Sequence, residues 1–298
     1  MRITTTTVAA ITGGSQGIGL GIARALARRG ARIAVLDIDE EALATASREL
    51  GGITDVAAFA VDVRDRDGLA SARERIESEL GPADMIVANA GVGLGAFQPL
   101  RQELAYSTWD YVVGINLDGV NNTIQTFLPP LLDRGGAGHI VTTASAAGLA
   151  VFPERSSGYT YHASKFAVIG LTEALRRGLH DIDADVSASV LIPGLVATSV
   201  AQNSVKHAPT SSLDPADTGR IQEMVTAGTA AAAAYGRDVD SVGELTLAAV
   251  EQDALYIPTD RLAENALTAR AAAIVEAMPD ASTHDTGLSD AMRERRRT

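Results

Sequence analysis

The stretch VAAITGGSQGIG occupies residues 8–19 and joins a short apolar run to a turn that carries Gly13, Gly17 and Gly19. The run Val8–Thr12 predicts a buried strand, and the apolar spacing after the turn predicts an amphipathic helix. Such a turn lacks Cβ atoms where the backbone must approach a pyrophosphate, which then rests on free N–H groups at the helix N-terminus. The stretch therefore indicates a dinucleotide-binding turn, although a strand–helix turn without a ligand has the same spacing.

Short apolar runs alternate with longer helical patterns through most of the chain. Further buried strands are predicted at residues 31–36, 56–61, 85–89, 139–143 and 186–192. Helices are predicted between them, from apolar residues three and four apart, at residues 18–29, 40–50, 66–80, 107–132 and 161–180. This alternation implies right-handed crossovers, and so a doubly wound α/β fold with a mostly parallel sheet and helices on both faces.

The alternation stops after Gly194, where residues 195–217 are polar and irregular. A loop of this length in a compact domain is usually a lid or a binding loop, so we predict a substrate-binding loop here. Helices near residues 216–234, 239–251 and 262–277 and a strand at 254–257 follow. We expect one domain over residues 1–278 and a polar tail over 279–298, whose arginines fit a frayed terminus better than a binding site.

The composition excludes several classes of protein. The chain has 298 residues with 46% hydrophobic residues, so it can bury a large core. Its net charge of −12 argues against a nucleic-acid partner, and its lack of cysteine excludes a disulfide framework and a thiol nucleophile. No signal peptide and no membrane-spanning segment is recognisable, so a cytoplasmic protein is expected. The only lysines are Lys165 and Lys206, in a chain that otherwise uses arginine.

Asp37 ends the second predicted strand, 18 residues after Gly19. A carboxylate at this place accepts hydrogen bonds from the hydroxyls of an adenosine ribose and repels a 2′-phosphate. No arginine stands in the glycine turn or directly after Asp37, so the sequence predicts NAD rather than NADP. Asp37 could instead cap the next helix, a task that Asp39 could perform equally well.

Tyr161 and Lys165 lie four residues apart at the start of a helical pattern, and so on one face of the helix. An ammonium group one turn away stabilises a phenolate, which makes Tyr161 a candidate proton donor and acceptor near neutral pH. An exposed Tyr/Lys pair without function is the alternative, but the scarcity of lysine favours a role for Lys165. Lys206 falls in the irregular segment and is expected to be merely solvated.

Together these features resemble the classical short-chain dehydrogenase/reductase family over about residues 8 to 200. The resemblance implies a Rossmann-type fold, an NAD cofactor, and a homodimer or homotetramer that binds a small alcohol or ketone. It implies the catalytic residues Asn116, Ser145, Tyr161 and Lys165. It implies the cofactor-binding residues Gly13, Ser15, Gln16, Gly17, Ile18, Gly19, Asp37, Asp62, Val63, Asn89, Ala90, Gly91, Tyr161, Lys165, Pro193, Gly194, Val196 and Thr198.

The family assigns a role to each of the four catalytic positions. Tyr161 would exchange a proton with the substrate oxygen, and Ser145 would hydrogen-bond the same oxygen. Lys165 would depress the tyrosine pKa and hold the nicotinamide ribose, while Asn116 would bind a water that relays the proton to bulk solvent. The activity implied is an NAD-dependent interconversion of a secondary alcohol and a ketone.

The sequence also departs from the family pattern. Ser145 and Tyr161 are 16 residues apart, so extra residues around 152–157 should bulge beside the active site. The usual C-terminal VDGG-like ending is replaced by residues 254–260. Residues 138–149 (GHIVTTASAAGL) and 190–200 are similar to a subgroup that includes aryl-ether Cα-dehydrogenases, which oxidise bulky benzylic alcohols.

Two other functions compete with this one. A sugar-nucleotide epimerase or dehydratase uses the same Tyr/Lys pair, but its glycine spacing differs and it needs a larger C-terminal substrate domain. A non-catalytic dinucleotide sensor tends to lose the tyrosine or the lysine, whereas all four catalytic positions are filled in this chain.

Overall fold

The computed structural model describes residues 1–94, 104–152, 158–212 and 218–280, together with residues 282, 285, 287 and 292. The chain divides into two compact units, Met1–Ala263 and Glu264–Thr298. The second unit contains α11 (Glu264–Glu276), of which no residue is buried. The expected division into a domain ending at residue 278 and a polar tail stays a prediction. Within the described part of the chain, no helix is long and apolar enough to cross a membrane.

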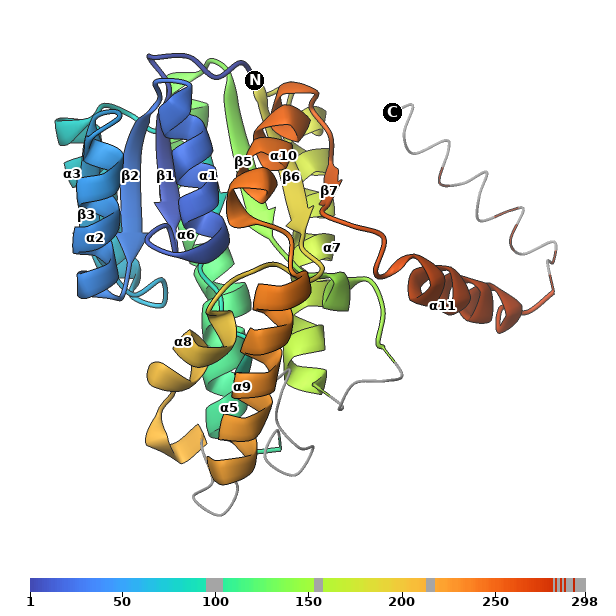
Figure 1. The fold of residues 1–298 in the computed structure, drawn as a ribbon. Coiled ribbons are helices and arrows are strands. Elements are labelled where there is room, and N and C mark those ends of the chain that lie inside the picture. Colours follow the sequence, from blue (N-terminus) through green and yellow to red (C-terminus); the bar gives the residue numbers. More distant parts are fainter. Residues whose placement is uncertain are drawn as a thin grey trace. The chain divides into compact units, whose positions relative to one another are not determined.

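One seven-stranded sheet, with every pairing parallel, forms the centre of the first unit (Figure 1). Its strand order is β3-β2-β1-β4-β5-β6-β7. The strands are β1 (Val8–Thr12), β2 (Arg32–Asp37), β3 (Val56–Ala60), β4 (Met85–Ala88), β5 (Gly138–Thr143), β6 (Val186–Ile192) and β7 (Tyr256–Pro258). Because the winding reverses between β1 and β4, a crevice opens there at the carboxyl ends of the strands. The predicted doubly wound α/β fold is confirmed.

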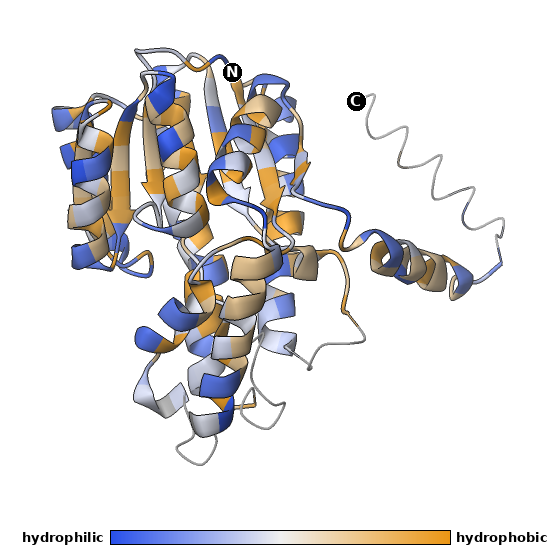
Figure 2. Cartoon of the chain, viewed as in Figure 1, coloured by the Kyte–Doolittle hydropathy of each residue, from blue (hydrophilic) through white to orange (hydrophobic). Residues whose placement is uncertain are grey.

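Helices cover both faces of this sheet, as the alternation in sequence requires. They are α1 (Gly17–Arg28), α2 (Glu40–Gly51), α3 (Arg66–Glu79), α6 (Gly119–Arg134), α7 (Tyr159–Asp181) and α10 (Val239–Glu251). Three further helices lie beyond the carboxyl ends of the strands (Figure 1): α5 (Tyr106–Val113), α8 (Val200–Lys206) and α9 (Thr218–Tyr235). In β1, Val8 and Ala10 belong to the apolar core shared with α3, α6 and α7. Ala9 and Ile11 belong to the core shared with α1, α2 and α10. The period-two alternation of a strand therefore supplies both layers, and Figure 2 shows apolar residues concentrated along the strands.

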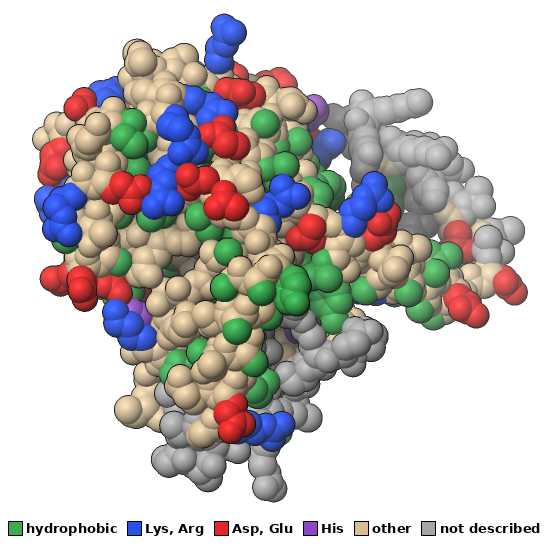
Figure 3. All heavy atoms as spheres, in the orientation of Figure 1, with side chains coloured by type: hydrophobic (Ala, Val, Ile, Leu, Met, Phe, Trp, Pro, Cys, Tyr) green, Lys and Arg blue, Asp and Glu red, His purple; other side chains and the backbone are tan. Residues whose placement is uncertain are grey.

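Helices α1 and α10 approach each other at their backbones. A Cβ on Gly21 would overlap the carbonyl oxygen of Val239, and a Cβ on Gly243 would overlap that of Gly21. Around this contact, Arg28 at the end of α1 and the next residue, Arg29, pair with Glu244 of α10 at 2.9 and 2.8 Å. Figure 3 shows cationic and anionic side chains interleaved over this face of the molecule. The α1 helix that follows the glycine turn is thus fixed from both sides.

Two predicted elements differ from the structure. The helix expected over residues 107–132 is interrupted by a π turn at Gly114–Asp118, which separates α5 from α6. The segment expected to be irregular over residues 195–217 contains α8 and a 3-10 turn at Thr210–Ser212, while residues 213–217 lie outside the described part. Apolar periodicity does not distinguish a π turn from an α turn, and α8 is too short to show a clear period.

Candidate active site

The glycine turn brings the backbone close to the carboxyl end of β4. Gly13 and Gly17 have φ values of +62° and +52°, which side chains disfavour. A Cβ on Gly13 would lie 2.8 Å from Cα of Ala90, and a Cβ on Gly19 would overlap the carbonyl oxygen of Gly13. The turn therefore tolerates no side chain at these positions, and it leaves an open cradle of backbone N–H groups at the start of α1.

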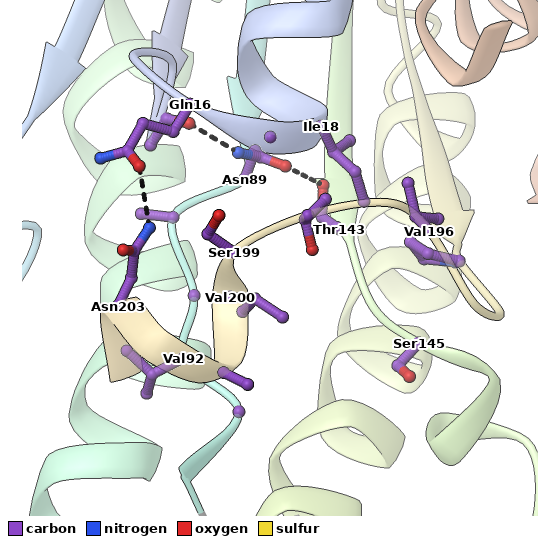
Figure 4. Close-up of a pocket in the computed structure, with 18 of the residues that line it drawn as sticks. Gln16, Ile18, Asn89, Val92, Thr143, Ser145, Val196, Ser199, Val200 and Asn203 are labelled. Carbon is purple, nitrogen blue, oxygen red and sulfur yellow. Dashed lines mark hydrogen bonds between the residues drawn. The ribbon is translucent and has the colours of Figure 1, made fainter. Parts of the chain in front are cut away.

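Asn89 connects this turn to the neighbouring strands (Figure 4). Its Nδ2 donates to the carbonyl oxygens of Thr12 and Gly13, each at 3.1 Å. Its Oδ1 accepts a hydrogen bond of 3.1 Å from the Thr143 hydroxyl at the end of β5. The Thr12 hydroxyl in turn accepts from the backbone N–H of Asn89 at 3.0 Å. Asn89 is thus a positioning residue that holds three strand ends in register.

Asp37, the last residue of β2, has a fixed carboxylate. Oδ2 accepts from the hydroxyl of Ser15 at 2.5 Å and from its backbone N–H at 3.2 Å. Oδ1 accepts from the backbone N–H of Ile38 at 2.8 Å. The cap of α2 is Asp39, whose side chain accepts from the N–H of Ala42 at 3.1 Å. Capping of this helix, the alternative role considered for Asp37, is therefore performed by Asp39.

Asp62 and Val63 follow β3 at the same edge of the sheet. Asp62 pairs with Arg64 at 2.6 Å, and hydrogen bonds from Arg64 hold the pKa of this carboxyl below its ordinary value against the opposing effect of burial. Val63 is buried and accepts a hydrogen bond of 3.0 Å from the Asn122 amide through its carbonyl oxygen. Both residues line the cavity described below.

Tyr161 and Lys165 lie on adjacent turns of α7. The Lys165 ammonium is 5.8 Å from the centre of the Tyr161 ring and donates to the carbonyl oxygen of Thr143 at 3.0 Å. Lys165 is 4% exposed, and burial lowers its pKa to about 8. Tyr161 is half-buried. The lysine is therefore still mainly charged at pH 7, beside the phenol that the sequence singles out.

Ser145 follows β5 and begins a 3-10 turn at Ala146–Gly148. Its hydroxyl oxygen accepts from the N–H of Ala147 at 3.2 Å, so the hydroxyl proton is not used by that bond. The N–H of Ala146 donates to the carbonyl oxygen of Pro193 at 2.8 Å, and this bond connects the turn to the segment after β6. Ser145 lines the same cavity as Tyr161.

Asn116 lies in the π turn and is fully buried. Its Oδ1 accepts from the N–H of Val92 at 2.8 Å, and its Nδ2 donates to the carbonyl oxygen of Val92 at 2.9 Å. The same Nδ2 donates to the Ser164 hydroxyl at 3.2 Å. A Cβ on Gly91 would lie 3.2 Å from Oδ1 of Asn116 and 3.4 Å from Nζ of Lys165, so Gly91 leaves space between these two groups.

The segment after β6 is held by the residues that follow β7 and by Arg237, which follows α9. The N–H of Gly194 donates to the Thr259 hydroxyl at 3.0 Å, and a Cβ on Gly194 would overlap the carboxylate of Asp260. Val196 is 5% exposed and forms an isolated bridge with Arg237. Thr198 approaches the glycine turn, since its Cγ2 is 3.2 Å from the position of a Cβ on Gly17.

These elements surround one cavity of about 980 Å³ (Figure 4). Its lining includes the glycine turn and the ends of β2 and β3, together with apolar side chains such as Phe152, Met224 and Leu262. The predicted site residues that line it are Gly13, Gln16, Gly17, Ile18, Asp37, Asp62, Val63, Asn89, Ala90, Gly91, Ser145, Tyr161, Lys165, Pro193, Gly194, Val196 and Thr198. Ser15, Gly19 and Asn116 do not line it; Ser15 bonds to Asp37, Gly19 packs against Gly13, and Asn116 bonds to Val92.

Other residues of the cavity did not emerge from the sequence. Asn203 and His207 of the segment after β6 line it, and Lys206 between them pairs with Asp39 at 2.7 Å. The expectation that Lys206 is merely solvated is wrong, because Lys206 forms this ion pair. The pair could not be predicted from local spacing, since Asp39 lies 167 residues away in the sequence. The bulge expected at 152–157 is described only at Phe152, which lines the cavity, and residues 153–157 lie outside the described part.

Comparison with known proteins gives a consistent result. The family model for short chain dehydrogenases matches residues 7–209. The C alpha-dehydrogenase of Sphingobium sp. is 32% identical over 84% of this chain and 79% of its own length. A crystal structure of a short chain dehydrogenase/reductase from Burkholderia phymatum in complex with NAD has a TM-score of 0.84 and 30% identity, covering 95% of this chain and 99% of that one. The apo form of LigD from Sphingobium sp. has a TM-score of 0.73 and 28% identity, covering 92% and 98%. The expected similarity to Cα-dehydrogenases is confirmed.

Proposed function

Since this chain belongs to the short chain dehydrogenase family of oxidoreductases, we propose that it is an NAD-dependent enzyme that interconverts a secondary alcohol and a ketone. The observation that carries the proposal is that the Tyr161/Lys165 pair, Ser145, the glycine turn and Asp37 all line one cavity. A dinucleotide sensor would need the turn and Asp37 but not a buried lysine beside a tyrosine.

The residues present fit a dinucleotide. The cradle formed by Gly13, Gly17 and Gly19 would receive the pyrophosphate, because it exposes backbone N–H groups and admits no Cβ. Asp62 and Val63 would hold the adenine, and residues 193–198 would contact the nicotinamide. When bound, the nicotinamide supplies or accepts the hydride. That a relative's structure contains NAD supports the same cofactor here.

Asp37 is the basis for proposing NAD rather than NADP. Its carboxylate is fixed by Ser15 and Ile38, so it can accept hydrogen bonds from ribose hydroxyls without reorganisation and would repel a phosphate there. Two cationic side chains near Asp37 already form ion pairs, Arg64 with Asp62 and Lys206 with Asp39. Neither is left to bind a 2′-phosphate.

The proton transfer would be performed by Tyr161. Lys165 carries its charge in a buried position 5.8 Å from the ring centre, where a cation favours the phenolate over the phenol. Ser145 would donate its remaining hydroxyl proton to the substrate oxygen and so orient it. Asn116 keeps one lone pair on Oδ1 beyond its bond to Val92, and this atom would hold a water that connects Lys165 to bulk solvent.

The apolar side chains that line the cavity favour a bulky substrate. Phe152, Met224 and Leu262 offer the lining that an aromatic or long aliphatic alcohol needs. The similarity to the C alpha-dehydrogenase agrees with a benzylic alcohol as the first candidate. We further propose that the enzyme works in the cytoplasm as a homodimer or homotetramer.

A direct assay tests the proposal. The protein is mixed with NAD⁺ and a panel of secondary alcohols that includes benzylic ones, and the absorbance of NADH is followed. We expect turnover that falls about 10²- to 10⁴-fold in Tyr161→Phe, because this variant loses the general acid–base group. NADH binding should be unchanged in the same variant. Tight NADH binding without turnover on a broad panel would instead favour the sensor, and full activity in Tyr161→Phe would refute the mechanism.

A further inference from the structure

Helix α8 crosses the cavity and is tied to both of its sides. Toward the dinucleotide side, Nδ2 of Asn203 donates to Oε1 of Gln16 at 2.9 Å, as Figure 4 shows. Toward the other side, the hydroxyl of Ser204 accepts from the N–H of Gly93 at 2.7 Å, and its carbonyl oxygen accepts from the Tyr111 hydroxyl at 3.2 Å. The helix is therefore held by side-chain contacts at both of its edges and not only by the chain that leads into it.

The outermost contact is the ion pair between Lys206 and Asp39. The ammonium of Lys206 lies 2.7 Å from Oδ2 of Asp39, and Nε2 of His207 lies 3.6 Å from the same oxygen. The Asp39 side chain is only 10% exposed, whereas that of Lys206 is 55% exposed. The hydrogen bond from Lys206 is the largest cause that lowers the pKa of the Asp39 carboxyl. The pair joins residues 167 positions apart, so it brings α8 against the loop after β2.

The Asn203–Gln16 hydrogen bond and the Lys206–Asp39 ion pair enclose the groove in which we place the adenosine and the pyrophosphate. Gln16 belongs to the glycine turn, and Asp39 follows the ribose-binding candidate Asp37 by two residues. Gln16, Asp37 and Asp39 line the cavity, as do Asn203 of α8 and His207, the residue directly after this helix. A dinucleotide seated on the glycine turn would consequently lie behind the Asn203–Gln16 and Lys206–Asp39 contacts.

We propose that Lys206, with Asp39 as its partner, is a cofactor-retaining residue: the ion pair closes α8 over the dinucleotide groove and must open each time the dinucleotide enters or leaves. This inference rests on the proposed function, because it takes the occupant of the groove to be NAD or NADH. Lys206 touches neither substrate nor the reacting atoms. It acts on the rate of cofactor exchange through the position of α8, and in many enzymes product release or the opening of a lid limits turnover.

The chain allows the charge pair to be removed without damage to the fold. Oδ1 of Asp39 caps α2 through Ala42, while Oδ2 receives Lys206. Asparagine is as good an N-cap as aspartate, so Asp39→Asn keeps the cap and removes the charge. Lys206→Met removes the charge from an exposed side chain of similar length. Arg75→Met is the matched control, since Arg75 forms an exposed pair with Glu79 at 3.2 Å and neither residue lines the cavity.

The test is a double-mutant cycle on NADH release. Each protein is loaded with NADH and mixed rapidly with an excess of NAD⁺, and the loss of bound-NADH fluorescence gives the dissociation rate. We expect Lys206→Met and Asp39→Asn each to accelerate release about two- to fivefold, in keeping with an exposed ion pair. The double variant should release NADH no faster than the faster single variant. Arg75→Met should match the wild type, and added salt should accelerate release from the wild type more than from Lys206→Met.

The outcomes separate this inference from the proposed function. Wild-type protein that binds NADH and releases it at the same rate as both single variants would overturn the retaining role and leave the function intact. Effects of the two variants that multiply in the double variant would also overturn it, because the residues would then act independently. A wild-type protein that binds no NADH at all would overturn both proposals.

Discussion

At the scale of single residues, two neighbouring aspartates divide the work at the end of β2. Asp39 caps α2 with one oxygen and pairs with Lys206 through the other. Asp37 therefore neither caps α2 nor pairs with Lys206, and its carboxylate is oriented by Ser15 and Ile38. The separation allows the cofactor preference to be tested at Asp37 without disturbing the helix.

We expect Asp37→Ser to raise the KM for NAD⁺ about 10- to 100-fold, as loss of hydrogen bonds to a charged group would. The KM for NADP⁺ should fall at the same time, because the repelling charge is removed. Steady-state kinetics with both cofactors measure the ratio. Glu40→Gln is the control for a charge removed nearby, because Glu40 is exposed in the first turn of α2 and does not line the cavity, and it should leave that ratio unchanged. A ratio that is the same in Asp37→Ser and wild type would show that Asp37 does not select the cofactor.

The buried charge of Lys165, which we propose serves catalysis, destabilises the folded state. Burial lowers its pKa from 10.5 to about 8, so the native state binds this proton more weakly than the unfolded state does. Below pH 8 the lysine is charged in both states and the native state bears the penalty of about 3 kcal/mol. The penalty disappears as the pH rises from about 8 to 10.5, where the unfolded state also becomes neutral.

Lys165→Met should therefore abolish turnover and yet stabilise the cofactor-free protein at pH 7, by roughly 1–2 kcal/mol. The estimate allows for the carbonyl oxygen of Thr143, which loses its donor at a cost of about 1–2 kcal/mol. Urea unfolding of both proteins between pH 7 and pH 10 measures the difference, which should shrink with rising pH. A variant that is less stable at pH 7, or a difference independent of pH, would contradict the buried charge.

The residue-level site was accessible from the sequence where its members share one local element. Tyr161 and Lys165 are one helical turn apart, and the glycine turn is contiguous, so spacing alone places each group. The Lys206–Asp39 pair could not be predicted in this way, because it depends on where α8 is folded back over β2. The two bonds between Asn116 and Val92 depend likewise on a π turn that apolar spacing does not reveal.

At the scale of elements, β5 and β6 share a buried pair of polar side chains, His139 and Ser189. The Ser189 hydroxyl donates to the carbonyl oxygen of Ala254 at 2.6 Å, so it accepts from Nε2 of His139, 2.7 Å away. The other ring nitrogen of His139, Nδ1, is buried without a partner among the residues described. Burial is the main cause that lowers its pKa to about 4.

This histidine should make the sheet sensitive to acid. Between about pH 6.5 and pH 4 the unfolded state binds a proton that the native state does not, so stability falls as the pH falls through this window. The full loss amounts to about 3 kcal/mol. His139→Asn removes the titration and keeps a side-chain N–H group as a possible donor to Ser189. Its unfolding free energy should depend less steeply on pH than that of the wild type, and equal slopes would rule out His139 as the source.

At the scale of the whole molecule, the order of the strands explains why residues from distant parts of the sequence meet. The ends of β1, β2, β3, β4 and β5 deliver the glycine turn, Asp37, Asp62, Asn89 and Ser145 to one edge of the sheet. Alternating strands and helices were enough to predict this convergence, because crossovers between parallel strands have one hand. The path of the chain after β6 could not be predicted in this way, since α8 and α9 pack against each other rather than on the sheet.

The assembly is the property of the whole molecule that the family resemblance predicts. We expect light scattering to give a mass of two or four times the 30.9 kDa of one chain. The mass should not change with salt concentration if apolar contacts between the helices form the interface, because screening weakens only charged contacts. A mass of one chain at micromolar concentration would refute the oligomer.

The scarcity of lysine has a practical consequence. Lys165 is buried, so Lys206, at the outer edge of the cleft, is the accessible side-chain amine of the chain. An amine-reactive dye, or a surface activated for amine coupling, would attach at Lys206 besides the chain terminus. Immobilisation by that chemistry would orient a large share of molecules with the cleft toward the support and hinder ligand access. Acylation of the same amine would also remove the charge that pairs with Asp39, so the labelled protein should release the dinucleotide as fast as Lys206→Met does.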